Sequence, residues 1–305
     1  MFKYIIKRFF ISLITIWILA TLTFFLVRVL PGDPFSSDKI TPEIKANMMK
    51  YYGMDKSVPE QYIKYMGNLV RGDLGSSLKY KNRSVSGMIK TAFPKSADLG
   101  LRSLVFSIII GLFLGIVAAL NHNKFWDNTS MIIAVIGVSV PSFIIGGLIQ
   151  YFFGVRWRIL PVAQWKGFAH TIMPTFALGL GTVAQLARLM RTSMLDVVGQ
   201  DYIKTAKAKG LSPAQVTVKH QIRNAILPVV TVLGPLAAAL LTGTFVIEQI
   251  FAIPGLGSHY IISIQNLDYT MVLGLTIFFG AFLVFMNFLV DIAYGFVDPR
   301  IRVGK

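Results

Sequence analysis

The sequence predicts an all-α membrane protein with six transmembrane helices. Of its 305 residues, 54% are hydrophobic and only 14% are charged, whereas a soluble domain carries about 25% charged residues. A helix needs roughly 20 apolar residues to cross the hydrocarbon core of a bilayer. Six stretches of about that length or more lack Asp, Glu, Lys and Arg, and they cover residues 9–27, 103–123, 128–155, 167–187, 224–247 and 269–290.

The first of these stretches follows a basic N-terminus and could be mistaken for a secretory signal peptide. Its apolar run, 9–27, is too long for that, and no small-residue cleavage site follows it before Pro31. We therefore expect a retained first span.

A long polar segment, at about 31–98, separates the first two spans. It contains helix-like stretches at 42–52 and 60–71. We expect a small ordered segment on the outer side of the membrane rather than a separate domain. Residues 1–98 would then form an N-terminal span with its external segment, and residues 99–305 a five-span core.

A seventh uncharged window covers residues 249–267 and is ambiguous. It contains Pro254, Gly255 and Gly257, which would break a lipid-facing helix and leave backbone groups without hydrogen-bond partners. We expect an external or re-entrant loop here, and therefore six spans.

The distribution of Lys and Arg predicts the orientation. With the N-terminus inside, both ends of the chain and the inner loops hold most of these residues outside the long external segment. The short outer loops hold only Arg156, Arg158 and Lys166. This bias follows the positive-inside rule and explains the formal charge of +16 better than nucleic-acid binding does. Both termini are expected in the cytoplasm.

The longest inner loop, at about 192–225, is predicted to form a rigid helical hairpin. Val198, Tyr202, Ala206 and Gly210 recur every four residues and would share one helical face, and Gly210 suits the position after a helix end. A basic helix lying on anionic headgroups is the alternative. Such helices usually present Leu, Phe or Trp to lipid, whereas this face of tyrosine and small residues better suits a groove on another protein.

A second helix is predicted directly after the glycine. Ser212 fits an N-cap, Pro213 the first helical position, and Gln215 completes a capping box. Pro228 marks the entry into the fifth span.

This loop and the start of the fifth span resemble the cytoplasmic loop of ABC importer permeases, in the oligopeptide, dipeptide and nickel branch. The match covers residues 201–231 and includes KTAKAKGLSPAQVTVKHQIRNAILP. Lys204 stands where the general consensus has Glu, and this branch commonly has a basic residue there. The resemblance extends in order along nearly the whole chain and is specific to the B-type subunit. Further matches are LVRVLPGDPF (26–35), YGMDKSVPEQYIKYMGNLVRGDLGSSL (52–78), SVPSF (139–143), ARLMRTSMLDV (187–197), FAIPGLG (251–257) and DPRIR (298–302).

This resemblance implies a permease subunit in a bacterial plasma membrane that imports oligopeptides or dipeptides. It would pair with a second, C-type permease around the translocation path, with two cytoplasmic ATPase subunits below and an extracytoplasmic binding protein above. ATP and Mg²⁺ would be bound by the ATPases, with no cofactor on this chain. The coupling helix that contacts an ATPase would contain Asp201, Tyr202, Thr205, Ala206, Lys207, Ala208, Lys209, Gly210 and Leu211.

Polar residues inside the spans are candidates for the translocation path. Gln185 lies in the fourth span, and Asn287 and Asp291 lie four residues apart on one face of the sixth. The alternatives are hydrogen bonds to a partner subunit or, for Asp291 and Glu248, closeness to the membrane interface.

Other chemistry finds little support in the sequence. The chain has no cysteine, its four histidines have no metal-ligand spacing, and it lacks the P-loop motif, so ATP must be hydrolysed by another chain. The small residues at 111, 115 and 179–184 indicate close helix packing. Three alternatives remain open. The first is import of nickel or a metal chelate. The second is an intramembrane protease, which would need a second acid or a Ser/His pair, and the third is a self-sufficient channel, which would not need the hairpin.

Overall fold

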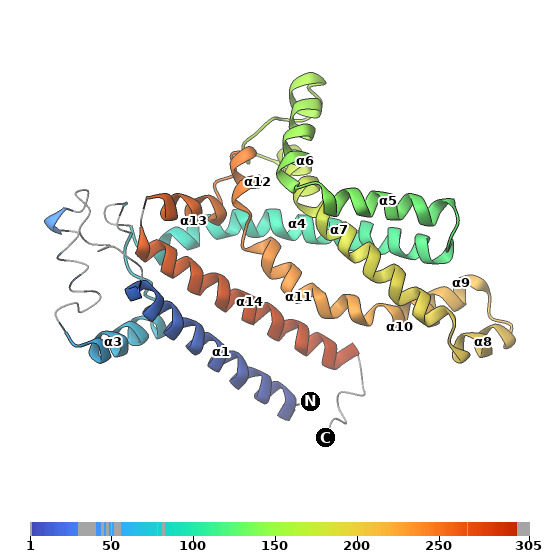
Figure 1. Ribbon diagram of the computed structural model, residues 1–305, viewed down its shortest axis with the longest axis horizontal. Helices are drawn as coiled ribbons and strands as arrows, with labels where there is room; N and C mark the ends of the chain where they lie inside the picture. The colour runs from blue at the N-terminus through green and yellow to red at the C-terminus, as the bar shows by residue number, and fades with distance from the viewer. Residues whose placement is uncertain are drawn as a thin grey trace.

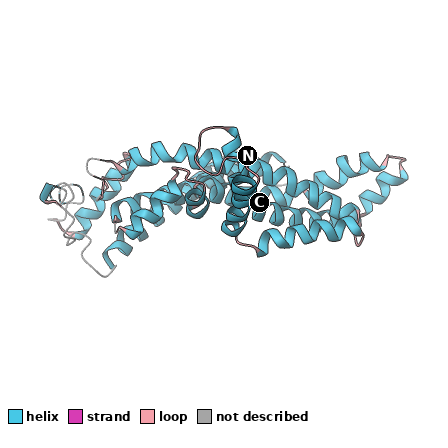
Figure 2. Cartoon of the chain, turned by 90° about the horizontal axis from the view of Figure 1, so that it is seen from above, coloured by secondary structure: helices cyan, strands magenta, loops and turns pink. Residues whose placement is uncertain are grey.

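The computed structural model describes residues 2–29, 41–43, 46, 49, 51, 56–77, 79–80, 83–266 and 268–297. These residues form helices joined by turns, and within them the only β-pairing is one isolated bridge between Ser76 and Ser84. Viewed from above, helices extend along the whole length of the molecule (Figure 2). Most of the helix-like stretch 42–52, the first-span exit 30–35 and the basic tail 298–305 lie outside the described residues.

The described helices fall into six long ones and a set of shorter ones. The long ones are α1 (Phe2–Val29), α4 (Val85–Leu120), α5 (Phe125–Ser139), α7 (Phe168–Val198), α11 (Leu227–Leu241) and α14 (Tyr269–Val297). The shorter ones are α3 (Val58–Val70), α6 (Ser142–Ile149), α8 (Asp201–Ala208), α9 (Pro213–Val216), α10 (Arg223–Ala225), α12 (Phe245–Ile250) and α13 (Leu256–Gln265), with π-helical segments at Gln150–Arg156 and Thr217–Ile222.

Four of the long helices, α1, α14, α11 and α4, pack side by side in that order (Figure 1). Helix α1 contacts α14, α14 contacts α11, and α11 contacts α4. Helix α7 packs along α4 and is also covered by α5. Figure 1 shows the start of α1, the end of α14 and the short helices α8–α10 toward the same end of this bundle.

Small residues allow the close packing of α4 against α7. A Cβ added at Gly115 would lie only 2.6 Å from the carbonyl oxygen of Ala187. Ser107 Oγ donates a 2.9 Å hydrogen bond to the carbonyl oxygen of Gly179. Because helices in lipid associate through van der Waals packing and interhelical hydrogen bonds, these residues bring the two backbones together. The predicted packing role of the small residues is confirmed at these positions.

The third predicted span, 128–155, is not one straight helix. The chain bends by 102° between α5 and the helical segment Ser142–Arg156. Pro141 has no N–H, and its ring disfavours a helical conformation at the preceding residue. Val140 accordingly has an extended backbone, with φ −95° and ψ 120°. The third predicted span is therefore broken by a bend, and the proline is the physical reason.

Five helical segments are long and apolar enough to cross a membrane: Tyr4–Leu26, Val85–Leu120, Phe168–Val198, Leu227–Ile250 and Tyr269–Ile292. The bent pair would make a sixth if it counts as one span. The expected all-α membrane fold is confirmed, while the count of six depends on that pair.

Several boundaries differ from the sequence prediction. Helix α4 begins at Val85 rather than near 103 and passes without a break through position 98, where we divided the sequence. The predicted helix at 60–71 corresponds to α3, whose first turn is closed by Glu60 accepting from the Ser57 N–H at 3.1 Å.

The window 249–267 is more ordered than the loop that the sequence predicted, because it contains α13. The carboxylate of Glu248, fully buried, accepts from Ser96 Oγ at 2.7 Å and from the Ser258 N–H at 3.2 Å. Ser96 Oγ also accepts from the Leu256 N–H at 2.8 Å. These contacts join α12 and the first turn of α13 to α4. Glu248 therefore stabilises the packing of this turn and is not exposed to a path.

Candidate functional site

The helical hairpin follows α7 and begins with a break in the helix at Gly199 and Gln200. Helix α8 ends in the arrangement that the sequence predicted. Gly210 has φ +78°, its N–H donates to Lys207 O at 3.0 Å, and the Leu211 N–H donates to Ala206 O at 3.4 Å. This pair of bonds is a Schellman motif, which a glycine in the left-handed region allows without steric strain.

The second helix of the hairpin starts with the predicted capping box. Ser212 Oγ accepts from the Gln215 N–H at 3.4 Å, and Gln215 Oε1 accepts from the Ser212 N–H at 3.1 Å. Pro213 occupies the first turn, where its missing N–H has no helical partner to lose. From there the chain continues through the π-helical segment Thr217–Ile222 and α10 toward α11. Both halves of the turn thus satisfy their own backbone groups.

Val198, Tyr202, Ala206 and Gly210 do not form the predicted shared outer face, because Val198 and Gly210 lie outside α8 and Ala206 is buried. Val198 belongs to α7, because the break at Gly199 ends the four-residue periodicity. The side chain of Ala206 is 4% exposed. It packs inside the hairpin, so its small size permits contact between α8 and α9 rather than with another protein.

The buried centre of the hairpin contains Ile203 and Val216 together with Ala206. The sequence analysis missed Ile203 and Val216. The signal was available, because Ile203 and Ala206 are three residues apart and therefore neighbours on a helix. The remaining candidate coupling residues lie on the outer side of α8 and in the turn that follows it. Leu211 is half-buried, and the exposed ones are Asp201, Tyr202, Thr205, Lys207, Ala208, Lys209 and Gly210.

Lys204, at the position where the general consensus has Glu, is also exposed and pairs within its own helix. Its Nζ lies 2.9 Å from Asp201 Oδ1. An exposed pair of this kind contributes less than about 1 kcal/mol. It leaves the surface of α8 predominantly basic, through Lys207 and Lys209.

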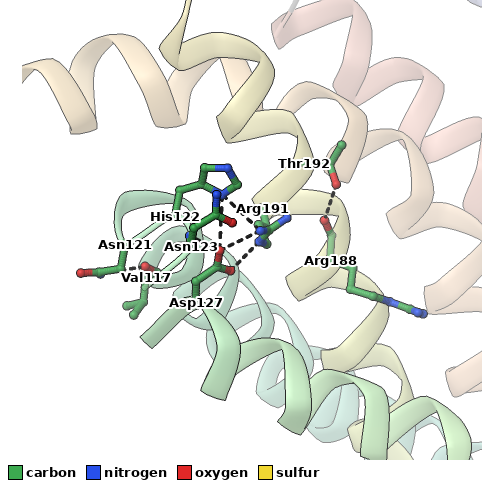
Figure 3. Close-up of polar contacts among 8 residues, drawn as sticks. All are labelled: Val117, Asn121, His122, Asn123, Asp127, Arg188, Arg191 and Thr192. Atoms are coloured by element: carbon green, nitrogen blue, oxygen red, sulfur yellow. Dashed lines mark hydrogen bonds and ion pairs between the residues drawn. The ribbon is translucent and has the colours of Figure 1, made fainter. Parts of the chain in front are cut away.

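An ion pair ties the turn between α4 and α5 to α7, next to the hairpin (Figure 3). Arg191 Nε donates to Asp127 Oδ1 at 2.6 Å, and Arg191 Nη2 donates to Asp127 Oδ2 at 2.7 Å. The Asn123 N–H donates to the same carboxylate at 2.8 Å, and His122 Nδ1 lies 3.2 Å from Arg191 Nη2. Asp127 is 1% exposed. The sequence analysis did not find this pair.

A pocket of about 390 Å³ lies between the bend at Pro141 and α7. Gln185, one of the three candidates for the translocation path, lines it together with Arg188. Ser142 and Thr182 add hydroxyl groups, and the other lining residues are glycines, one alanine and apolar side chains.

The other two path candidates lie elsewhere. Asp291 Oδ2 is 3.2 Å from Arg8 Nη1, which joins α14 to α1. Asn287 faces α11, because a Cβ added at Gly234 would lie 3.0 Å from Asn287 Oδ1. The structure therefore does not bring Asn287 or Asp291 to the pocket that Gln185 lines. Among the described residues, no group of three or more His, Asp or Glu side chains is placed to hold a metal ion.

Comparison with protein families identifies the chain. Residues 111–303 match the family described as the binding-protein-dependent transport system inner membrane component, and residues 1–99 match the N-terminal family of the same system's membrane component. The chain belongs to this family of transport permeases. It is therefore a transport permease subunit, a multi-pass protein of the inner membrane, and not an enzyme.

Curated relatives of the permease match it over their full length. The dipeptide transport system permease protein DppB of Bacillus subtilis is 46% identical over 306 residues, with 100% of this chain and 99% of the relative covered. The oligopeptide transport system permease protein OppB of Haemophilus influenzae is 41% identical, with 99% and 100% covered. OppB of Escherichia coli K12 is 38% identical with the same coverage.

Solved structures of ABC importers share the fold of the permease. One chain of an amino acid ABC transporter crystallised with histidines has a TM-score of 0.50 at 15% identity, covering 70% of this permease and 94% of that chain. One chain of the inward-facing MetNI methionine ABC transporter has a TM-score of 0.54 at 17% identity, covering 69% and 96%. The resemblance to ABC importer permeases stated from the sequence is confirmed.

Proposed function

We propose that this permease forms half of the translocation path of an ATP-driven importer of dipeptides or oligopeptides. The observation that carries this proposal is the full-length relationship, at 46% and 41% identity, to permeases named for dipeptide and oligopeptide transport. These names favour peptides over the nickel alternative.

The partners would be a second, C-type permease, two cytoplasmic ATPase subunits and an extracytoplasmic binding protein. ATP and Mg²⁺ would be bound by the ATPases. Both termini of this chain would lie in the cytoplasm. That orientation is supported by the bias of Lys and Arg and by the position of the start of α1, the end of α14 and the hairpin toward one end of the bundle (Figure 1).

Helix α8 would be the coupling helix and would lie in a groove on one ATPase. Its exposed surface supplies the contact, including Tyr202, 43% of whose surface is exposed, and the small residue Ala208. Ala206 supports that surface from inside the hairpin. Because both ends of the turn are closed by their own hydrogen bonds, ATPase closure would displace the hairpin as a rigid body and tilt α7 and α11.

Reconstitution of the complete transporter tests this function. The two permeases, the ATPases and the binding protein would be assembled in proteoliposomes, and uptake of a labelled dipeptide, a labelled tripeptide and Ni²⁺ would be measured with and without ATP. We expect ATP-dependent uptake of peptide. The matched control contains an ATPase unable to hydrolyse ATP. Uptake of Ni²⁺ without peptide uptake would contradict the cargo, and uptake by this chain alone would contradict the assembly.

A further inference from the structure

The pocket at the bend of the third span has the size and lining of a ligand site. Its volume of about 390 Å³ falls within the range of roughly 300–1,000 Å³ that small-molecule sites occupy. Pro141 and Ile145 line it from the bend, and Leu178 lines it from α7. The bend of 102° holds α6 away from a straight continuation of α5. The bend at Pro141 therefore opens the pocket between α6 and α7.

Arg188 is the one charged side chain among the described residues that line this pocket. It is exposed, and its guanidinium is in none of the ion pairs found among the described residues. Arg191, one turn further along α7, is instead held by Asp127. Figure 3 shows the side chain of Arg188 extending away from that pair, and only its backbone carbonyl takes part in a contact there, accepting from Thr192 Oγ1 at 3.1 Å.

An unpaired guanidinium beside apolar helices calls for an anionic partner or water. Gln185 lies three residues earlier on the same helix and lines the same pocket, so its amide can donate a further hydrogen bond. The planar guanidinium matches a carboxylate in two-point geometry. Every linear peptide with a free C-terminus carries one such carboxylate, whatever its side chains are.

We propose that Arg188, assisted by Gln185, binds the C-terminal carboxylate of the peptide as it passes through this pocket. The inference rests on the proposed peptide function and adds the atom group that the permease recognises. The apolar lining would then contact the side chains of the peptide without selecting among them, while Arg188 holds its C-terminal carboxylate.

Uptake of trialanine and of trialanine amide by the complete reconstituted transporter tests this assignment. Each rate would be divided by the occupancy of the binding protein, which is measured separately for both peptides. In Arg188→Gln we expect uptake of trialanine to fall about ten-fold, as loss of a charge-assisted hydrogen bond predicts, and uptake of the amide to change less than about two-fold. Arg188→Lys keeps the charge but loses the two-point geometry, so its rate for trialanine should fall between those of the wild type and Arg188→Gln. Lys124→Gln removes an exposed charge at the start of α5 and should transport both peptides as the wild type does.

A second measurement applies whether or not the binding protein accepts the amide. A tripeptide with a free C-terminus and a photoreactive benzoylphenylalanine would be irradiated in the complete transporter, and the labelled positions would be mapped by mass spectrometry. Labelling of α6 and α7 at the pocket, lost in Arg188→Gln, would support the site.

The outcomes separate this inference from the function itself. Equal slowing of trialanine and its amide would overturn it, because an arginine that binds a lipid phosphate or an acid of the second permease affects both peptides alike. Labelling that is unchanged in Arg188→Gln would also overturn it. If the wild-type transporter imports neither peptide, the proposed function fails instead.

Discussion

Arg191 and Asp127 are 64 positions apart in the sequence and form a two-point ion pair, with both guanidinium–carboxylate distances below 3 Å. Asp127 is buried, and Arg191 lies on α7 just before the hairpin. The pair therefore holds the turn between α4 and α5 against the helix that enters the hairpin. A displacement of the hairpin would be transmitted to α5 as well as to α7.

Breaking this pair should destabilise the permease. Asp127→Ala leaves the guanidinium of Arg191 without its partner in a mostly buried site, which typically costs about 3 kcal/mol or more. We expect a clearly lower Tm for the purified complex in detergent. Asp196→Ala removes an exposed aspartate from the same region of α7 and serves as the control. Equal Tm values for the two variants would show that the pair does not stabilise the fold.

The turn at Gly210 should tolerate only residues that accept a left-handed backbone. A Cβ at this position meets no other atom within 4 Å, so a substitution acts through φ alone. Gly210→Ala should cost about 1 kcal/mol and increase hydrogen exchange at the hairpin, and Gly210→Asn should cost less. Gly199 also has free space but a helical φ of −79°. Gly199→Ala is therefore expected to leave exchange unchanged, and a similar increase in both alanine variants would refute the conformational argument.

Two alanines of α8 should respond differently to a charge. Ala206 is buried within the hairpin, so Ala206→Glu should disorder it and expose it to limited proteolysis. Ala208 is exposed, so Ala208→Glu should leave the hairpin intact but weaken co-purification of the ATPase and lower peptide uptake. Ala214→Glu places the same charge on the exposed side of α9 and is the control. Normal ATPase binding and uptake by Ala208→Glu would contradict the docking role of α8.

Ser96 should contribute more stability than Ser86, a half-buried serine of the same helix. Its hydroxyl donates to Glu248 and accepts from the Leu256 N–H, both in buried surroundings. Ser96→Ala leaves both partners with one hydrogen bond fewer and should cost about 2 kcal/mol, seen as a lower Tm and faster exchange in α13. Ser86→Ala removes an exposed hydrogen bond on α4, and we expect a change below about 0.5 kcal/mol.

The features that sequence reasoning found are local ones. Gly210 and the capping box of Ser212 and Gln215 depend on residues within a few positions of each other, so their pattern in the sequence is sufficient. The burial of Ala206 was missed because it depends on whether one helix continues from Val198. The break at Gly199 decides that question, and a four-residue repeat does not reveal it.

The features that sequence reasoning missed depend on contacts between distant segments. Neither Asp127 nor Arg191 carries a local signal of the other, since the helices that bring them together must pack first. Pro141 did indicate the bend, because a proline disfavours a helical backbone at the residue before it. The sequence analysis missed the bend because the whole uncharged stretch 128–155 is long enough to span. Likewise, Asn287 and Asp291 share a face of α14 as their spacing indicates, yet their neighbours on α11 and α1 could not be read from that spacing.

The Schellman motif and the capping box meet at Gly210–Ser212, so the turn is held by hydrogen bonds within the hairpin itself. A segment that is already ordered loses little conformational entropy when another protein binds it. If α8 docks on an ATPase as we propose, a newly inserted permease would present an ordered docking surface before the ATPase binds. Adding excess ATPase should therefore not restore peptide uptake by a variant with a disrupted turn, because its hairpin is already disordered before the ATPase binds.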